Sequence, residues 1–298
     1  MTSGASDRGE TPVQFECGSS LLLGIVHQGA PGAKLGVLVV VGGPQTRVGS
    51  HRQFVLLARH LAGGGVPTMR FDYRGMGDSE GKPRTFETVG EDIRAALDAF
   101  ALACPSLERF AIWGLCDAAS AAAFYAAADP RVAGIALLNP WVRTERGQAS
   151  AFVRDYYPRR LFSFSLWRKV LRREFRAAVS FGAFVDNLLR AGAPRIRRAG
   201  TSREGPGGCP WPEEGSSLPG KVLDALERFD GAVLLVLSGR DLTASEFKGV
   251  VRGSPAWRRL LAADRVTRRE LEEADHTFSN ATWRDQVERW TLDWLRRL

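Results

Sequence analysis

The stretch 109–124 most constrains the fold of this chain, because it joins an apolar strand to a small-residue helix through one tight turn. The apolar run 110–113 predicts the strand, and the alanine-rich segment after Asp117 predicts the helix. Cys116 lies at the turn, two residues after Gly114. In a nucleophile elbow, the side chain at this place stands at the helix N-terminus and carries the reactive group.

The turn departs from the usual elbow pattern G-x-S-x-G. Here Gly114-Leu-Cys-Asp-Ala118 has cysteine in place of serine and alanine in place of the last glycine. Taken alone, a cysteine before an alanine-rich helix is more often a small buried hydrophobe than a nucleophile. Whether Cys116 is reactive therefore depends on the partners that the rest of the chain supplies.

Apolar runs alternate with amphipathic segments along most of the chain. Strands are predicted at 35–41, 67–71, 110–113, 132–139, 232–237 and 266–271, with a β-hairpin at 13–27. Besides the helix that follows Cys116, helices are predicted at 50–61, 88–102, 222–229 and 282–298. This alternation favours the α/β class, with a mostly parallel sheet that helices cover on both faces.

The alternation breaks after Pro140. Residues 141–220 are basic, aromatic and irregular, and the stretch 143–203 holds fifteen Lys and Arg against four Asp and Glu. We expect residues 1–140 and 221–298 to form the core and residues 141–220 to form an inserted helical cap. The basic block suits nucleic acid, anionic lipid or an anionic substrate, or is a solvated arginine-rich face. No nucleic-acid-binding module is recognisable, so nucleic acid is not an expected partner.

The four cysteines are scattered along the chain without C-x-x-C spacing. This pattern predicts neither a disulfide framework nor a zinc site and favours a reducing compartment, so we expect a cytoplasmic protein. The polar N-terminus lacks the pattern of a signal peptide, and no apolar run reaches the roughly 18 residues of a membrane span. The glycine-rich stretches 42–45 and 75–80 fit no nucleotide-binding motif, so we expect no cofactor and no metal.

Two further residues, each placed after a predicted strand later in the chain, can complete a catalytic triad with Cys116. Asp241 and His276 each follow such a strand, and reactive groups gather beyond the carboxyl ends of the strands in open α/β sheets. The order nucleophile, acid, histidine is that of α/β-hydrolases. The histidine would take the thiol proton, and the carboxylate would orient the imidazole. Three carboxylates on the loop of His276 compete with Asp241 for this role: Glu272, Glu273 and Asp275.

An oxyanion hole would need two backbone N–H groups beside Cys116. The usual arrangement takes one from the residue after the nucleophile, here Asp117, and the other from the loop that follows the strand 35–41. By position the loop donor falls on Pro44, which has no N–H. We therefore assign this donor to Gln45, with a plain glycine-rich turn as the alternative.

Several motifs resemble those of one known family. They are Gly42-Gly-Pro-Gln45 with Val48-Gly-Ser-His-Arg-Gln-Phe54, Trp113-Gly-Leu-Cys-Asp-Ala-Ala-Ser120, and Ser238-Gly-Arg-Asp-Leu-Thr-Ala244. Across residues 15–280 the chain resembles the exosortase A system-associated hydrolase 1 family, within the α/β-hydrolase superfamily. The resemblance implies an eight-stranded α/β-hydrolase core in a bacterial cytoplasmic protein encoded beside exopolysaccharide and exosortase genes. With a cysteine in place of the usual serine, the elbow also resembles that of dienelactone hydrolase.

We therefore expect cysteine-dependent acyl chemistry on an ester or thioester. Cys116 attacks the carbonyl carbon, His276 handles the proton, and Asp241 orients His276. The expected substrate is a small molecule or a glycan- or lipid-linked acyl compound. The alternatives are an acyltransferase on the same fold and a non-catalytic binding or scaffold protein with a vestigial triad. Peripheral contact of the cap with an anionic membrane is a further alternative, and the sequence leaves the oligomeric state open.

Overall fold

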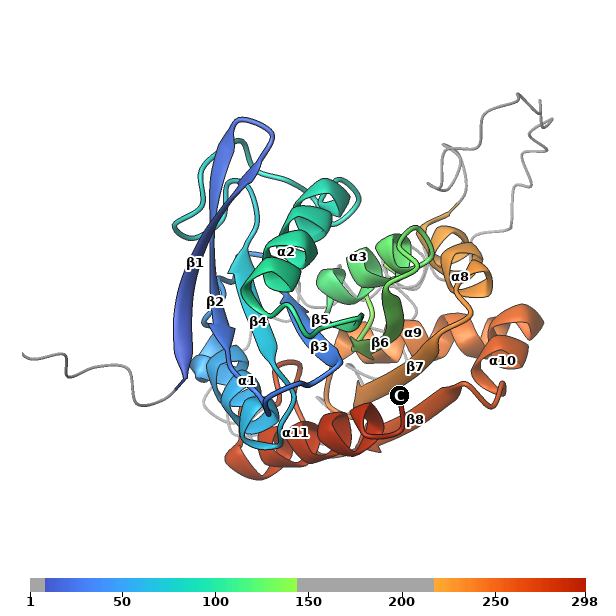
Figure 1. Cartoon of the computed structure of the whole chain (residues 1–298). Helices are drawn as coiled ribbons and strands as arrows, with labels where there is room; N and C mark the ends of the chain where they lie inside the picture. The colour runs from blue at the N-terminus through green and yellow to red at the C-terminus, as the bar shows by residue number, and fades with distance from the viewer. Residues whose placement is uncertain (1–8, 144–216) are drawn as a thin grey trace, which may run out of the picture.

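The computed structural model describes residues 9–143 and 217–298. Eight strands form one sheet in the order β1-β2-β4-β3-β5-β6-β7-β8 (Figure 1). The strands are β1 (Glu10–Cys17), β2 (Ser20–His27), β3 (Leu35–Val40), β4 (Thr68–Asp72), β5 (Arg109–Leu115), β6 (Val132–Leu138), β7 (Ala232–Ser238) and β8 (Val266–Leu271). β2 pairs antiparallel with β1 and with β4, and the other neighbours are parallel. The predicted eight-stranded, mostly parallel sheet is confirmed.

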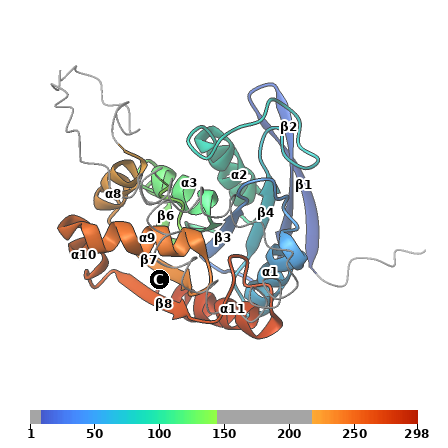
Figure 2. The ribbon, with the colours of Figure 1, turned by 180° about the vertical axis from the view of Figure 1, so that it is seen from behind.

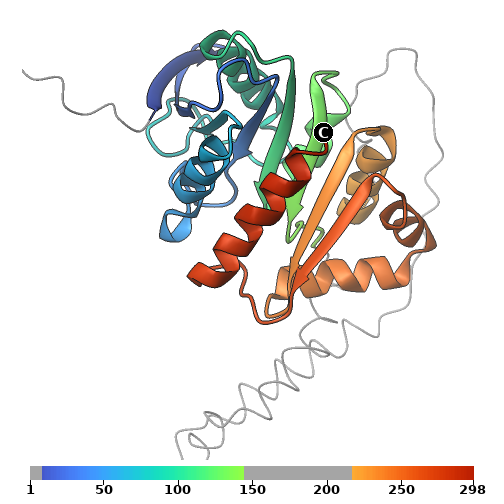
Figure 3. The same ribbon diagram turned by 60° about the horizontal axis from the view of Figure 1, so that its bottom comes forward.

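Helices cover both faces of the sheet. They are α1 (Gln53–Gly63), α2 (Gly90–Ala103), α3 (Asp117–Ala126), α8 (Leu218–Arg228), α9 (Leu242–Gly253), α10 (Pro255–Leu261) and α11 (Ala281–Leu295). α1 and α11 lie side by side on one face, opposite α2, α3 and α8 (Figures 1 and 2). α11 lies close to β7, and in Figure 3 its axis runs along the strands β7 and β8. Gly134 of β6 permits this close approach, because a side chain there would press on Trp294 and Leu298.

The burial of each strand follows from its place in the sheet. Val37, Leu38, Val39 and Val40 of β3 are all buried, because helices cover both faces of the central strands. This explains why β3 reads as a continuous apolar run in the sequence. β8 ends the sheet, and its residues 268–270 are exposed.

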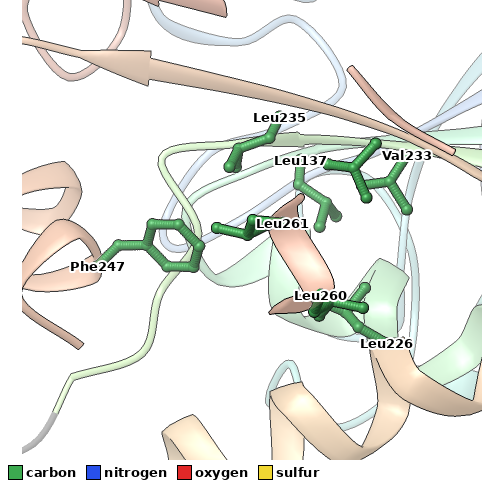
Figure 4. Close-up of a pocket in the computed structure, with 8 residues that line it drawn as sticks. Leu137, Leu226, Val233, Leu235, Phe247, Leu260 and Leu261 are labelled. Atoms are coloured by element: carbon green, nitrogen blue, oxygen red, sulfur yellow. The ribbon is translucent and has the colours of Figure 1, made fainter. Parts of the chain in front are cut away.

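A small apolar cavity lies between β6, β7 and β8 and the helices α8, α9 and α10 (Figure 4). Its lining residues are Leu137, Leu226, Val233, Leu235, Phe247, Leu260, Leu261 and Val266. All are apolar, so the cavity offers no polar side chain to orient a substrate. None belongs to the predicted triad, so the cavity is separate from the candidate site.

The start of α1 differs from the prediction. The sequence predicts Ser50 as its N-cap, but Ser50–Arg52 form a short 3₁₀ turn and α1 begins at Gln53. His51 and Arg52 have φ angles of 52° and 62°. These left-handed conformations interrupt a right-handed helix, which explains the later start.

The second half of the core also begins earlier than predicted. α8 starts at Leu218, with Pro219 in its first turn where proline is tolerated, whereas the sequence predicts a start at Val222. Residues 218–220 therefore belong to a core helix, and most of the predicted cap, residues 144–216, lies outside the described residues. The sequence did not predict α9 and α10. None of the helices in the described ranges is both long and apolar enough to cross a bilayer.

Asn139 links the carboxyl ends of β6 and β7 to the loop after β8. Its side-chain amide donates to Ser238 Oγ at 2.9 Å and to the carbonyl of His276 at 3.0 Å. Its amide oxygen accepts from the N–H of Ser238 at 2.8 Å, and Ser238 Oγ donates to the carbonyl of Asp275 at 2.7 Å. Asn139 is completely buried, so this network holds the three chain segments in a fixed relation.

Asn139→Ala is expected to lower the free energy of unfolding by about 2–4 kcal/mol, because it leaves buried polar groups unpaired and adds backbone strain. The strain arises because Asn139 has a φ of 44°, a value that alanine tolerates poorly. Asn139→Gly is the matched control, since it removes the same hydrogen bonds without that strain and should lose less stability. Urea unfolding followed by circular dichroism measures both variants, and wild-type stability in Asn139→Ala would contradict the role of the network.

Candidate active site

Cys116 lies on a strained turn between β5 and α3. Its φ and ψ are 64° and −122°, a conformation that residues other than glycine rarely adopt and that clusters at functional turns. The N–H of Cys116 donates to the Leu138 carbonyl at 2.8 Å, and the N–H of Trp141 donates to the Cys116 carbonyl at 3.1 Å. Gly114 is required here, because a side chain would collide with the backbone of Ala118. The half-exposed thiol therefore lies at the N-terminus of α3.

Asp241 and His276 come together beside this thiol. Nδ1 of His276 lies 2.9 Å from Oδ2 of Asp241. The two groups form an ion pair when the imidazole is protonated. The Cys116 side chain lies within hydrogen-bonding reach of the same imidazole. The structure thus brings together the three residues that the sequence predicts as a triad.

The N-terminus of α9 fixes the Asp241 carboxylate. Asp241 is the N-cap of this helix and accepts from the N–H groups of Thr243 at 3.2 Å and Ala244 at 3.0 Å. Both hydrogen bonds and the helix dipole favour a negative charge at this position. Gly239 lets the Asp241 loop approach the histidine loop closely, since a side chain there would collide with the backbone of Glu272.

The competing carboxylates on the histidine loop point elsewhere. Asp275 accepts from both the N–H and the hydroxyl of Ser279. Glu272 and Glu273 are exposed. Asp241 is therefore the carboxylate that lies against the imidazole.

The surroundings of His276 favour its charged form. Burial disfavours the imidazolium, but the Asp241 carboxylate and the Cys116 thiol outweigh burial and raise the pKa of His276 to about 10. Because this pKa lies well above neutral, the imidazole is protonated at pH 7. An imidazolium next to a cysteine stabilises the thiolate, which is the nucleophilic form of sulfur.

The loop donor assigned from the sequence, Gln45, is already engaged. Its N–H closes a turn onto the carbonyl of Gly42 at 3.3 Å. The N–H of Gly43 faces the elbow instead and donates to Oδ2 of Asp117 at 2.9 Å. Gly43 has a φ of 56°, which glycine adopts at little cost. Of these two loop amides, the N–H of Gly43 is the one that reaches Asp117, the residue after Cys116.

The other three histidines lie away from the elbow. His27 is buried and accepts a hydrogen bond from Arg70 Nε at 2.9 Å. Burial and the neighbouring Arg70 charge lower the pKa of His27 to about 4. His60 lies 3.8 Å from a carboxylate of α11, and His51 is exposed on the turn before α1. His276 is the histidine that contacts the elbow cysteine.

The described rim of the site is aromatic and charged. Trp141 follows β6 and contacts the Cys116 backbone, and the Arg143 guanidinium lies 4.1 Å from the centre of the Trp141 ring. Nε of Arg143 also lies 3.3 Å from Oε2 of Glu246. Most of the predicted basic block lies outside the described residues. Within residues 9–143 and 217–298, no three His, Cys, Asp or Glu side chains are grouped to hold a metal ion.

The sequence analysis missed three residues that support the site. Asn139 and Ser238 hold the histidine loop through buried hydrogen bonds. Each is a polar residue at the end of an apolar strand, and a buried polar group needs hydrogen-bond partners, so this position could have indicated their role. Gly43 had no comparable signal. Which of two nearby amides faces the elbow depends on the dihedral angles of the loop, which the glycine-rich sequence leaves open.

Comparisons with known proteins identify the fold and the family. Similar solved structures include an esterase from Pyrococcus furiosus (14% identity, TM-score 0.63, covering 100% of this chain and 96% of that one). A putative α/β hydrolase from Agrobacterium tumefaciens has 17% identity and a TM-score of 0.57, covering 96% of this chain and 95% of that one. A dienelactone hydrolase from Anabaena variabilis has 13% identity and a TM-score of 0.56, covering 97% of each chain. No curated protein matches the sequence. The pattern of the alpha/beta hydrolase family matches residues 37–290, most of the chain, and the protein therefore belongs to the alpha/beta hydrolase family.

Proposed function

We propose that the protein hydrolyses an ester or thioester through a cysteine nucleophile. The observation that carries the proposal is the position of His276, between the Asp241 carboxylate at 2.9 Å and the Cys116 thiol on its strained turn. Membership of the alpha/beta hydrolase family supports hydrolase activity. A link to exopolysaccharide and exosortase systems, and a cytoplasmic location, are proposed from the motif resemblance alone.

Acylation begins with the thiolate of Cys116. Its sulfur adds to the carbonyl carbon, and the C=O electron pair moves to the oxygen, which then accepts from the N–H groups of Gly43 and Asp117. The C=O bond then re-forms and the bond to the leaving oxygen or sulfur breaks. His276 gives its proton to the leaving group, which leaves a neutral imidazole and an acyl-cysteine.

Deacylation reverses the roles. Neutral His276 takes a proton from water, and the oxygen of that water adds to the thioester carbon. The C–S bond breaks, the carboxylic acid departs, and the Cys116 thiolate again faces an imidazolium. Asp241 holds the ring in one tautomer and stabilises its charged form in both halves of the cycle. An alcohol in place of the water gives acyl transfer by the same steps.

Iodoacetamide at pH 7 should label Cys116 before Cys17 and Cys104, because both of these are buried and burial raises their thiol pKa values. Cys209, outside the described residues, is replaced by alanine throughout. His276→Ala should slow labelling of Cys116 on the order of tenfold, because the imidazolium no longer stabilises the thiolate. Mass spectrometry of the labelled peptides measures the rates, and an unchanged rate in His276→Ala would contradict the ion pair.

Cys116→Ala should abolish hydrolysis of p-nitrophenyl acetate, and Asp241→Asn should lower kcat on the order of 10⁴-fold, because the imidazole loses its orientation and charge partner. Glu273→Gln is the matched control, since this exposed carboxylate on the histidine loop pairs with Arg240. Near wild-type activity in Asp241→Asn would count against the triad.

Intact-mass spectrometry with a panel of acyl esters and acyl thioesters separates the alternatives. An acyl adduct on Cys116 that water releases supports the hydrolase. An adduct released only by an added alcohol or glycan points to the acyltransferase. A protein that keeps its fold but forms no adduct with any compound points to the binding or scaffold alternative.

A further inference from the structure

The carboxylate of Asp117 sits among backbone amides at the start of α3. Its Oδ2 accepts from the N–H of Gly43 at 2.9 Å, and its Oδ1 accepts from the N–H of Ala118 at 3.1 Å. The N–H of Asp117 itself also favours the charged form of this carboxylate. The loop after β3 and the N-terminus of α3 thus close around one acidic group.

Two of these three amides are the ones from which this fold builds its oxyanion hole. One is the N–H of the residue after the nucleophile, here Asp117, and the other comes from the loop between β3 and α1, here Gly43. A substrate oxyanion must accept from these N–H groups at about 2.7–3.1 Å. The carboxylate of Asp117 already accepts from the N–H of Gly43 at 2.9 Å, and it therefore competes with the oxyanion for that donor.

The surroundings of this carboxylate are shaped to hold it. Gly42 lies against Oδ1, and any side chain at position 42 would collide with that oxygen. The N-terminus of α3 stabilises a negative charge through its dipole. Burial raises the pKa of the Asp117 carboxyl, although the three N–H groups and the charge of His276 favour the ionised form.

We infer that the Asp117 carboxylate is an internal occupant of the oxyanion hole, which an acyl substrate must displace before Cys116 can attack. The inference rests on the proposed cysteine chemistry. Asp117 is then a specificity-determining residue. A substrate with many contacts to the enzyme offsets the displacement, whereas a small activated ester has few contacts and reacts slowly.

Asp117→Ala tests the inference, because it removes the occupant and keeps both amide donors. The rate of Cys116 acylation is measured in a single turnover with p-nitrophenyl acetate, from the release of p-nitrophenolate. Loss of one oxyanion-hole donor costs about 10²–10³-fold in kcat, so freeing the hole should raise the acylation rate at least about tenfold. Asp117→Asn keeps the shape without the charge and should fall between the two proteins.

Two controls separate this effect from general damage. Alkylation of Cys116 by iodoacetamide needs no oxyanion hole, so its rate should change little in Asp117→Ala. Asp129→Ala removes another carboxylate, just past the far end of α3, where it pairs with Arg131 at 2.7 Å, and should acylate at the wild-type rate. An Asp117→Ala protein that acylates no faster than the wild type overturns the inference.

Amide hydrogen exchange gives a readout that does not depend on catalysis. Exchange at Gly43 and Ala118 should be faster in Asp117→Ala than in the wild type and unchanged in Asp129→Ala. Equal exchange in all three proteins overturns the inference. If no variant forms an acyl-enzyme while Cys116 is still alkylated, the proposed function fails and the displacement step with it. Faster exchange in Asp117→Ala would then still show that the wild-type carboxylate accepts hydrogen bonds from the N–H groups of Gly43 and Ala118.

Discussion

The close approach of α3 to the end of β5 is the constraint on which the site depends. Gly114 permits this approach, because any side chain at that position would meet the backbone of Ala118. The chain then turns through Cys116 at a φ of 64°, a strain of about 1–3 kcal/mol that must be offset elsewhere. Hydrogen bonds from the Cys116 N–H to Leu138 and from Trp141 to the Cys116 carbonyl hold the strained turn against the end of β6. The stability of the sheet thereby supports a half-buried sulfur in a fixed position.

The sheet also explains how residues so distant in sequence can meet. The strands β5, β7 and β8 run parallel, so the segments that follow them leave the same edge of the sheet. Asn139 and Ser238 then fix the final position of the histidine loop through buried hydrogen bonds. The parallel strands bring Cys116, Asp241 and His276 into one region, and the buried polar network aligns them.

Much of the fold, and the composition of the candidate triad, could be predicted from the sequence. Long apolar runs indicate buried strands, because helices cover both faces of the sheet. Asp241 and His276 follow such runs, so the sequence alone predicts that they lie at the carboxyl ends of parallel strands. The left-handed residues His51 and Arg52 could not be foreseen, because nothing in their chemistry demands a positive φ. The choice between Gly43 and Gln45 depends on loop dihedral angles in the same way. Composition and spacing describe regular structure well and irregular backbone poorly.

The edge strand β8 has a consequence for how the protein behaves in a crowded solution. Only β7 pairs with it among the described residues, so its outer N–H and C=O groups resemble a template for a further strand. Its exposed side chains are charged: Arg268, Arg269 and Glu270. Another chain that paired along this edge would have to bring these charges into a less polar environment, which is costly. This edge of the sheet is thus protected against growth by strand addition.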